Sequence, residues 1–255
     1  MRRDEGAVRE PPRRLVEQLE AAPSLPAGSD ERFSGYGVMG LPFASGHILA
    51  MRRFPASSVG PGYTSVWHRA PTGEWVFYAT VSPRQSCTRF FGNLASDSIQ
   101  TEISITWSAP FRFRVTVPAA SLDWEVGLGS TASTRLMSTA GRLLPRAAWQ
   151  SSMVLAAMGR AAGPLLGVGR VGLVGSVPNG QRFIANPRVL WAITDSRAVL
   201  GGEDLGPPGP IRPQAQLGDF WIPQRGMFAL GQSYFEPFDP ARHSSRTAGS
   251  QREAP

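Results

Sequence analysis

The chain has 255 residues, a formal net charge of +7 and a hydrophobic fraction of 42%, enough apolar side chains for the core of one large or two small domains. All 26 basic residues are arginines that stand singly or in pairs. The sequence therefore lacks the basic stripe of a nucleic-acid-binding protein, and we expect no such partner. The single cysteine excludes an internal disulfide and a multi-cysteine metal site, and it fits a reducing compartment.

The two ends of the chain are polar and carry mixed charge. Residues 1–32 lack the apolar segment of a secretory signal peptide, and we expect a disordered arm with a short helix where RRLVEQLEAA has helical spacing. We expect a disordered tail over residues 239–255. Between them, residues 33–238 form one predicted β-rich domain. No run of 18 apolar residues occurs, so we predict no membrane span and a cytoplasmic protein.

Three strands joined by tight turns are predicted within residues 45–81. They are rich in β-branched and aromatic residues and are bounded by Gly and Pro; their ranges are 47–54, 63–68 and 75–78. Because side chains alternate along a strand, Trp67 and His68 must point to opposite faces. The same holds for Arg52 and Arg53, so one of these two arginines points toward whatever the sheet encloses.

The neighbouring segments favour an antiparallel sheet. The Gly-rich stretch 35–42 does not match a dinucleotide-binding loop, and we interpret it as an entry loop near a sheet end. Residues 101–107, 111–117 and 122–128 alternate between apolar and polar side chains. Three such runs with short breaks predict a meander with one polar face.

Residues 131–166 change character, because β-branched residues become rare and apolar residues take helical spacing. Pro145 separates two predicted helices. Apolar helix faces usually pack into a core, so we expect this pair to cover a sheet edge or to plug a barrel. The alternative is a lid or an element that touches a membrane.

The last third of the domain returns to strands. Strand-forming runs are predicted at 170–177, 182–185 and 189–194, and Asn179–Gly180 predicts a hairpin turn. Strands, then two helices, then strands is not the alternating order of an α/β protein. We therefore predict a mainly β fold, in which an antiparallel meander closes into a barrel or a two-sheet sandwich with a helical insertion at 131–166.

The strand GEWVFY and the ITW run carry a resemblance to a known group of proteins. Over residues 33–236 the rhythm of Trp-containing strands resembles lipocalin-like barrels of the carotenoid hydratase and attachment-protein type, and Gly73–Glu74–Trp75 is similar to the Gly-x-Trp signature of lipocalins. The resemblance implies a barrel with an apolar pocket. No catalytic residue of that group has a counterpart in this chain.

The favoured function is the binding of a small, largely apolar molecule in a pocket of this barrel or sandwich. We predict no bound cofactor. The expected pocket residues are aromatic side chains with a few cationic groups that orient the ligand: His47, Arg53, Tyr63, Trp67, Trp107, Trp221 and Arg225.

Two alternative functions remain open. The first is a metal-independent isomerase, hydratase or cyclase that uses acid–base chemistry in the same pocket, with candidates His47, His68, Asp204 and Asp219. No histidine spacing typical of a metal site occurs, so we predict no metal. The second is a structural or partner-binding domain, which would have a filled interior and an apolar patch on 131–166.

Overall fold

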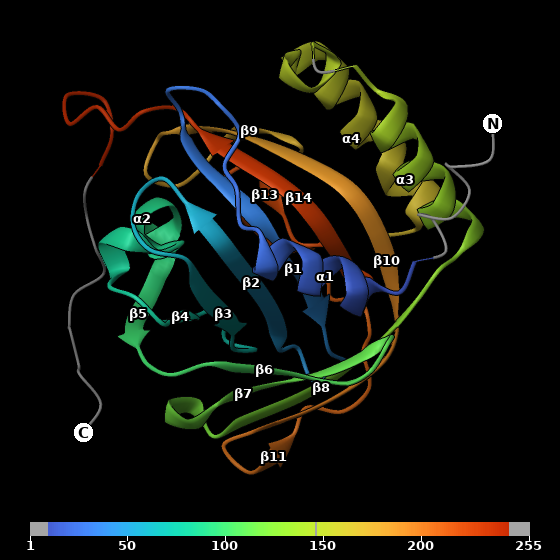
Figure 1. Ribbon diagram of the computed structural model, residues 1–255. Helices are drawn as coiled ribbons and strands as arrows, with labels where there is room; N and C mark the ends of the chain where they lie inside the picture. Colours follow the sequence, from blue (N-terminus) through green and yellow to red (C-terminus); the bar gives the residue numbers. More distant parts are fainter. Residues whose placement is uncertain (1–9, 146, 245–255) are drawn as a thin grey trace.

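The computed structural model describes residues 10–145 and 147–244, and its largest feature there is a 12-stranded sheet that curls into a half-barrel (Figure 1). The sheet order is β5 (Ala95–Gln100), β4 (Trp75–Ala79), β3 (Tyr63–Arg69), β2 (Ile48–Ser57), β1 (Glu31–Pro42), β14 (Met227–Phe235), β10 (Arg182–Leu200), β8 (Leu122–Gly129), β7 (Arg112–Val117) and β6 (Ser104–Ala109).

Smaller elements complete the architecture. Strands β9 (Val174–Ser176) and β11 (Glu203–Asp204) pair with β10, and β12 (Gln216–Leu217) pairs with β13 (Phe220–Trp221). The α-helices are α1 (Pro12–Ala21), α2 (Thr88–Phe91), α3 (Ala132–Leu143) and α4 (Ser152–Leu166). Single 3₁₀ turns lie at Pro83–Gln85, Gly92–Leu94, Pro118–Ala120 and Ala148–Gln150.

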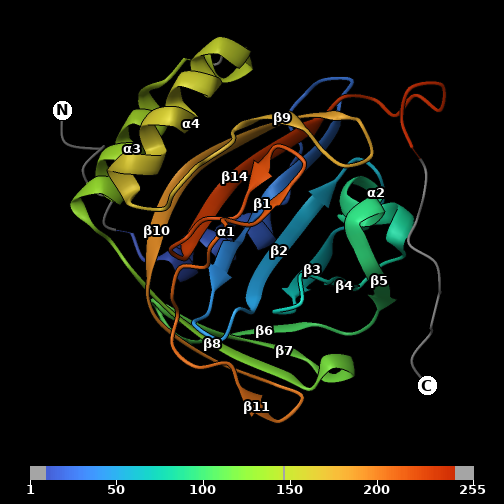
Figure 2. The same cartoon turned by 180° about the vertical axis from the view of Figure 1, so that it is seen from behind.

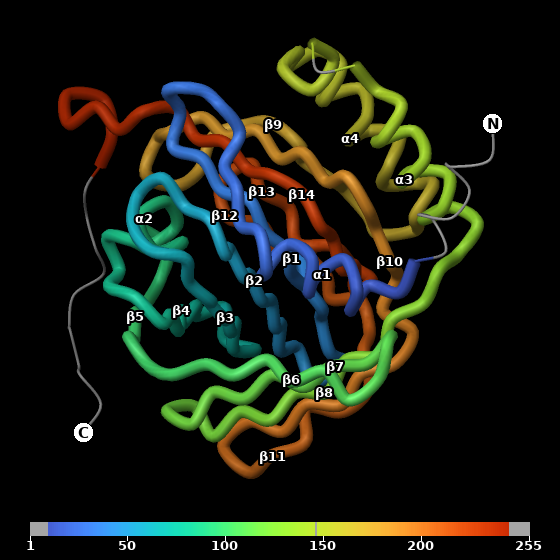
Figure 3. The backbone as a smooth tube through the Cα atoms, in the orientation of Figure 1, coloured from blue at the N-terminus to red at the C-terminus, as the bar shows by residue number. Residues whose placement is uncertain are grey.

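The predicted mainly β fold with a helical insertion at 131–166 is confirmed. Neighbouring strands pair antiparallel except for β4 and β5, which run parallel. The first strand of the sheet, β1, lies beside the last, β14 (Figure 3). The path ends at β5 and β6, which are consecutive in the chain, so the curled sheet returns toward its own starting edge.

Both faces of the sheet are largely buried over β1, β2 and β3, whereas β6, β7 and β8 keep one partly exposed face. The inner face carries Val38, Met51 and Phe228, and these side chains pack against Phe113 and Trp124 from the strands across the curl. The ring centroids of Phe113 and Phe228 are 5.5 Å apart, although two strands separate β7 from β14 in the sheet. Apolar rows from opposite walls therefore meet and fill the inside of the curl.

The outer face is covered by insertions instead of by the sheet itself. Ala50, Trp67 and Phe77 belong to this face and pack against α2 and the segment around β12 and β13. The helices α3 and α4 flank β10 on the same side, as the rear view shows (Figure 2). This covering arises because the residues between β8 and β9, and between β11 and β14, are long enough to fold over the strands.

The Gly-rich stretch is a strand and not the expected entry loop. Residues 35–42 belong to β1, and a Cβ atom at Gly35 or Gly37 would collide with carbonyl oxygens of Arg53 or Met51 in β2. Glycine is needed because the two backbones approach closely. A register shift between Val38 and Leu41 interrupts the ladder to β2, so carbonyl groups of β1 are free to accept other hydrogen bonds.

Strand β10 is one strand of 19 residues that joins the predicted runs 182–185 and 189–194. Pro187 lies between these two runs, and it sits at a register shift between Pro187 and Val189 in the pairing with β14. Proline cannot donate to the ladder and is tolerated in a sheet at such bulges. A second shift, between Ile193 and Asp195, bends the pairing with β8. The bulges let one strand serve both halves of the curl.

The helical insertion has clear ends. Thr131 caps α3 with a capping box to Thr134, and the Ser151 side chain accepts a hydrogen bond from Val154 at the start of α4. Gly167, with φ of 65°, ends α4 in the left-handed conformation that glycine adopts without strain. Among the described residues, no helix has both the length and the apolar character needed to cross a bilayer.

The chain ends differ in part from the expectation. The N-terminal arm contains α1, and its Val16 is buried with the inner-face residues. At the other end, His243 is buried and lies 2.9 Å from Glu236, so residues 239–244 are structured where a disordered tail was expected. Residues 1–9 and 245–255, the remainder of the two predicted disordered segments, lie outside the described residues.

Candidate functional site

A pocket of about 140 Å³ lies on the outer face, between the sheet and the helical insertion. Strands β1, β2, β10 and β14 form its floor, α3 and α4 form one wall, and residues 168–173 together with β13 form the other. Its lining is Gly35, Tyr36, Met39, Arg52, Phe54, Met137, Trp149, Met158, Ala162, Leu166, Val168, Val171, Gly172, Leu173, Ala185, Asn186, Pro187, Leu190, Phe220, Trp221, Pro223, Met227, Ala229, Gly231, Gln232 and Ser233. We call it the outer pocket.

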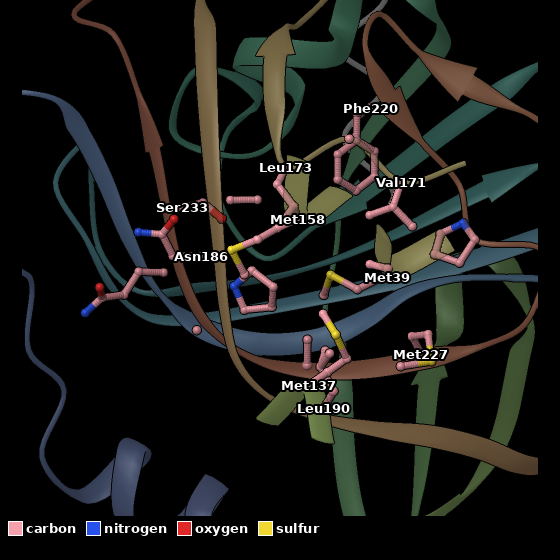
Figure 4. Close-up of a pocket in the computed structure, with 18 of the residues that line it drawn as sticks. Met39, Met137, Met158, Val171, Leu173, Asn186, Leu190, Phe220, Met227 and Ser233 are labelled. Atoms are coloured by element: carbon pink, nitrogen blue, oxygen red, sulfur yellow. The ribbon is translucent and has the colours of Figure 1, made fainter. Parts of the chain in front are cut away.

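Four of the seven methionines line the outer pocket. Met39 comes from β1, Met137 from α3, Met158 from α4 and Met227 from β14, and Figure 4 shows them gathered around the same space with Phe220 and Leu173. Methionine is unbranched, and its thioether is polarisable, so it adapts to irregular apolar shapes. The lining is therefore both apolar and adaptable.

Arg52 is the one charged residue in the lining, and only 6% of it is exposed. Its Nη1 donates to the carbonyl oxygens of Val38 and Met51, the latter at 3.0 Å, and its Nη2 donates to Met39 at 3.1 Å. The Val38 and Met39 carbonyls are those freed by the irregularity of β1. The guanidinium carbon lies 4.8 Å from the Trp67 ring centroid and 5.6 Å from that of Phe220.

The charge of Arg52 has no counter-ion among the described residues. Burial lowers the pKa of Arg52 to about 10, so the guanidinium stays protonated at neutral pH. A buried cation is costly unless hydrogen bonds or an anion compensate it. Here carbonyl dipoles and two aromatic faces supply the compensation.

A second, smaller cavity of about 40 Å³ continues from Arg52 into the outer-face core. Tyr63, Trp67 and Cys87 line it, and the Tyr63 hydroxyl lies 3.3 Å from the Cys87 sulfur. Burial raises the pKa of the Cys87 thiol. The thiol is therefore protonated at neutral pH and is a poor nucleophile.

The predicted ligand-binding residues are divided between the two faces. Trp221 lines the outer pocket, and Tyr63 and Trp67 line the smaller cavity. Arg53 lies on the inner face, where it pairs with Glu20 of α1 at 2.7 Å. Trp107 packs against the inner-face core.

The other predicted positions lie away from this lining. His47 is half-buried beside His68, and Arg225 is exposed near Gly167. Of the two neighbouring arginines, it is Arg52 and not the expected Arg53 that reaches the pocket.

The proposed His–Asp combination is not assembled. His47 Nδ1 lies 2.8 Å from His68 Nε2, with the rings stacked at 5.1 Å. Burial, and then the neighbouring His47, lower the pKa of His68 to about 4. Asp204 accepts a hydrogen bond from Arg197, and Asp219 accepts one from the backbone of Ser176. Each carboxylate thus satisfies local groups, which corrects the expected acid–base pairing.

Within the described residues, no group of three or more His, Cys, Asp or Glu side chains is arranged to hold a metal ion.

The residues that line the outer pocket could be predicted only in part from the sequence. The alternation of Arg52 and Arg53 showed that one arginine enters the enclosed side, but it did not show which face holds the cavity. The four methionines come from segments far apart in the chain, so no local sequence pattern predicts that they meet.

Asn186 also borders the outer pocket, from the strand position after Ala185, and its buried Oδ1 has no hydrogen-bond partner among the described residues.

Comparisons with known proteins identify no family. No family model matches the chain, and no curated protein matches it. Among solved structures, it is similar to acetoacetate decarboxylase from Legionella pneumophila, with 10% identity, a TM-score of 0.38 and coverage of 88% of this chain and 93% of that one. A second acetoacetate decarboxylase structure has 10% identity and a TM-score of 0.40, with coverage of 89% of this chain and 93% of that one. At these TM-scores the likeness says nothing of substrate or reaction. The expected barrel type of fold is supported by the curled sheet itself, and the likeness to lipocalin-like proteins stays a prediction.

Proposed function

We propose that the protein binds a small, largely apolar molecule in the outer pocket. The observation that carries this proposal is the lining, in which methionine, aromatic and aliphatic side chains surround an unfilled space beside one buried cation. Ligand sites are typically apolar hollows with a few polar groups that fix orientation. The inner face of the same sheet is filled by its own side chains, so the outer face offers the better site.

The size of the pocket limits the ligand. A volume of about 140 Å³ is close to that of a dry, apolar engineered cavity of about 150 Å³ that accepts benzene. The pocket thus suits a single ring or a chain of about six carbons. The cavity beyond Arg52 adds room for a small substituent.

The described residues favour binding over catalysis. The sequence contains no lysine, so no lysine side chain can form a Schiff base with a carbonyl substrate. The Cys87 thiol is protonated, and the His47–His68 pair does not line the pocket. The isomerase, hydratase or cyclase alternative therefore has no acid–base pair at this site.

Titration of tryptophan fluorescence tests the proposal, because Trp149 and Trp221 line the pocket. We expect saturable changes with toluene and with 1-hexanol. The variant Ala229→Leu adds three carbons to a pocket-lining position and should abolish this binding, while the free energy of unfolding changes by less than about 1.5 kcal/mol.

The matched control is Ala198→Leu, which adds the same atoms to the inner face, where Ala198 is fully buried. Overpacking there should cost about 1–3 kcal/mol of stability and leave binding unchanged. If neither probe binds to the wild-type protein, or if Ala229→Leu binds them normally, the outer pocket is not the ligand site.

A further inference from the structure

The guanidinium of Arg52 keeps two donors unused. Of its five N–H groups, the two on Nη1 and one on Nη2 are directed to backbone carbonyls. The N–H of Nε and the second N–H of Nη2 have no partner among the described residues. These two nitrogens form one edge of the guanidinium fork, and such an edge can hold a carboxylate through two parallel hydrogen bonds.

The surroundings of the free guanidinium edge of Arg52 favour the binding of an anion. The outer pocket contains no Asp or Glu in its lining, and the smaller cavity contains none either. Two glutamates from neighbouring elements have other partners, as Glu20 pairs with Arg53 on the inner face and Glu31 pairs with Arg89 at 2.6 Å. An uncompensated positive charge in an apolar setting attracts a ligand anion and disfavours a cation.

The position of Arg52 fixes how such a ligand would lie. Arg52 borders both cavities, together with Phe54, Phe220 and Ser233. The methionines lie on the side of the outer pocket, where α3 and α4 cover the sheet. A molecule with its charged end at Arg52 would place its hydrocarbon part among these thioethers, where contact area contributes to affinity.

We propose that the natural ligand is a small apolar carboxylate, about the size of benzoate or hexanoate, whose carboxylate pairs with Arg52. This inference rests on the proposed function of the outer pocket and names the ligand class. Arg52 has a structural role as well, because it satisfies the freed carbonyls of β1. The same carbonyls hold the guanidinium in place, so its free edge is oriented before the ligand arrives.

Matched pairs of ligands separate the charge from the hydrocarbon. Calorimetric titration at pH 7 should show hexanoate binding at least about tenfold more tightly than 1-hexanol, and benzoate more tightly than benzyl alcohol by a similar factor, because hydrogen bonds to charged groups are the stronger ones. The variant Arg52→Gln should lose this preference while it still binds the alcohols. Arg52→Lys should keep part of it.

Arg53→Gln is the matched control, since Arg53 is adjacent in the chain but lies on the inner face with Glu20. It should leave the preference for the acids unchanged. If Arg52→Gln fails to fold, the wild-type protein still decides the matter. Hexanoate affinity should fall as pH drops through the ligand's own carboxyl pKa, roughly 4–5, by a larger factor than 1-hexanol affinity over the same range.

The outcomes are distinguishable from those of the broader proposal. Equal binding of hexanoate and 1-hexanol, or a preference that survives in Arg52→Gln, overturns the carboxylate inference and leaves the apolar pocket standing. Failure of every acid and alcohol to bind overturns both. Loss of the acid preference in Arg53→Gln as well as in Arg52→Gln would assign the effect to the overall charge of β2 and would also overturn the inference.

Discussion

Around β1, β2 and β3 the two faces of the curled sheet are both largely buried, yet one is solid and the other contains a hollow. On the inner face, the ring of Phe228 lies 5.5 Å from Phe113, 6.2 Å from Trp107 and 5.9 Å from Trp191, measured between ring centroids. On the outer face, one residue away along β14, Met227 borders the outer pocket. On the inner face, side chains from opposed strands pack against each other closely. On the outer face, the inserted helices and loops leave a space between themselves and the strands. Burial alone therefore does not locate a site; the manner of covering does.

The largest expected effect tests whether the inner face is the solid one. Phe228→Ala should lower the free energy of unfolding by about 3–5 kcal/mol, because it leaves a cavity among rigid aromatic rings. The adjacent Met227→Ala should cost less than half as much, since Met227 already borders a space. Urea denaturation of both variants measures the difference. Equal losses would mean that the two faces are packed alike.

A second prediction concerns the His47–His68 pair, which lies beside the start of β2 and near the end of β3. The folded-state pKa of His68, about 4, lies below its unfolded value near 6.5. The unfolded chain therefore binds more protons between these values, and stability falls as pH falls from about 6.5 to 4, by about 3 kcal/mol in total. His47 adds to the loss, because burial lowers its pKa too, although the charge of Glu203 opposes this.

Denaturation curves at pH 7.0, 6.0 and 5.0 check this slope against the variant His68→Gln, which should show a much flatter dependence above pH 5. The carboxylates titrate at lower pH, so they contribute little in that window. A wild-type slope that matches the variant would show that the histidine pair does not resist protonation in the folded state.

The smallest expected effect concerns how α1 is fastened over the inner face. Burial alone would raise the pKa of Glu20, but the hydrogen bonds from Arg53 and Tyr36 lower it overall. About a quarter to a third of the two paired side chains is exposed, so Glu20→Gln should cost about 1 kcal/mol. Binding in the outer pocket should be unaffected. Hydrogen exchange of the α1 amides would record the loosening, and a change in ligand affinity would connect the two faces.

Much of the fold was accessible from the sequence, because alternation reports directly on strands. The runs around Ile105, Val115 and Val126 alternate strictly and became β6, β7 and β8 as predicted. The stretch around Gly37 was misread, since glycine forced by close backbone approach looks the same in a sequence as glycine in a loop. The continuous strand across Pro187 was missed for a similar reason, because the bulge that accommodates this proline forms in the pairing with β14, which is distant in the chain.

The site was less accessible. The alternation of side chains placed Arg52 and Arg53 on opposite faces of β2. It did not show which of the two faces would be filled by side chains of the sheet itself. Both faces of β2 and β3 are largely buried in the structure, and the alternation of side chains could not show on which face space would remain. The methionine lining depends on how α3 and α4 settle against β10, which is a matter of tertiary packing.

Because the outer pocket lies outside the curl, the strands that pack the inner-face core are separate from many of the residues that line the pocket. Met137 and Met158 belong to α3 and α4, and Trp221 belongs to the short strand β13; all three lie in segments that connect strands of the large sheet. Such connections tolerate changes in length and composition better than the sheet strands do. Changes in these connecting segments would therefore alter the shape of the outer pocket, while Arg52 stays held by carbonyl groups of β1.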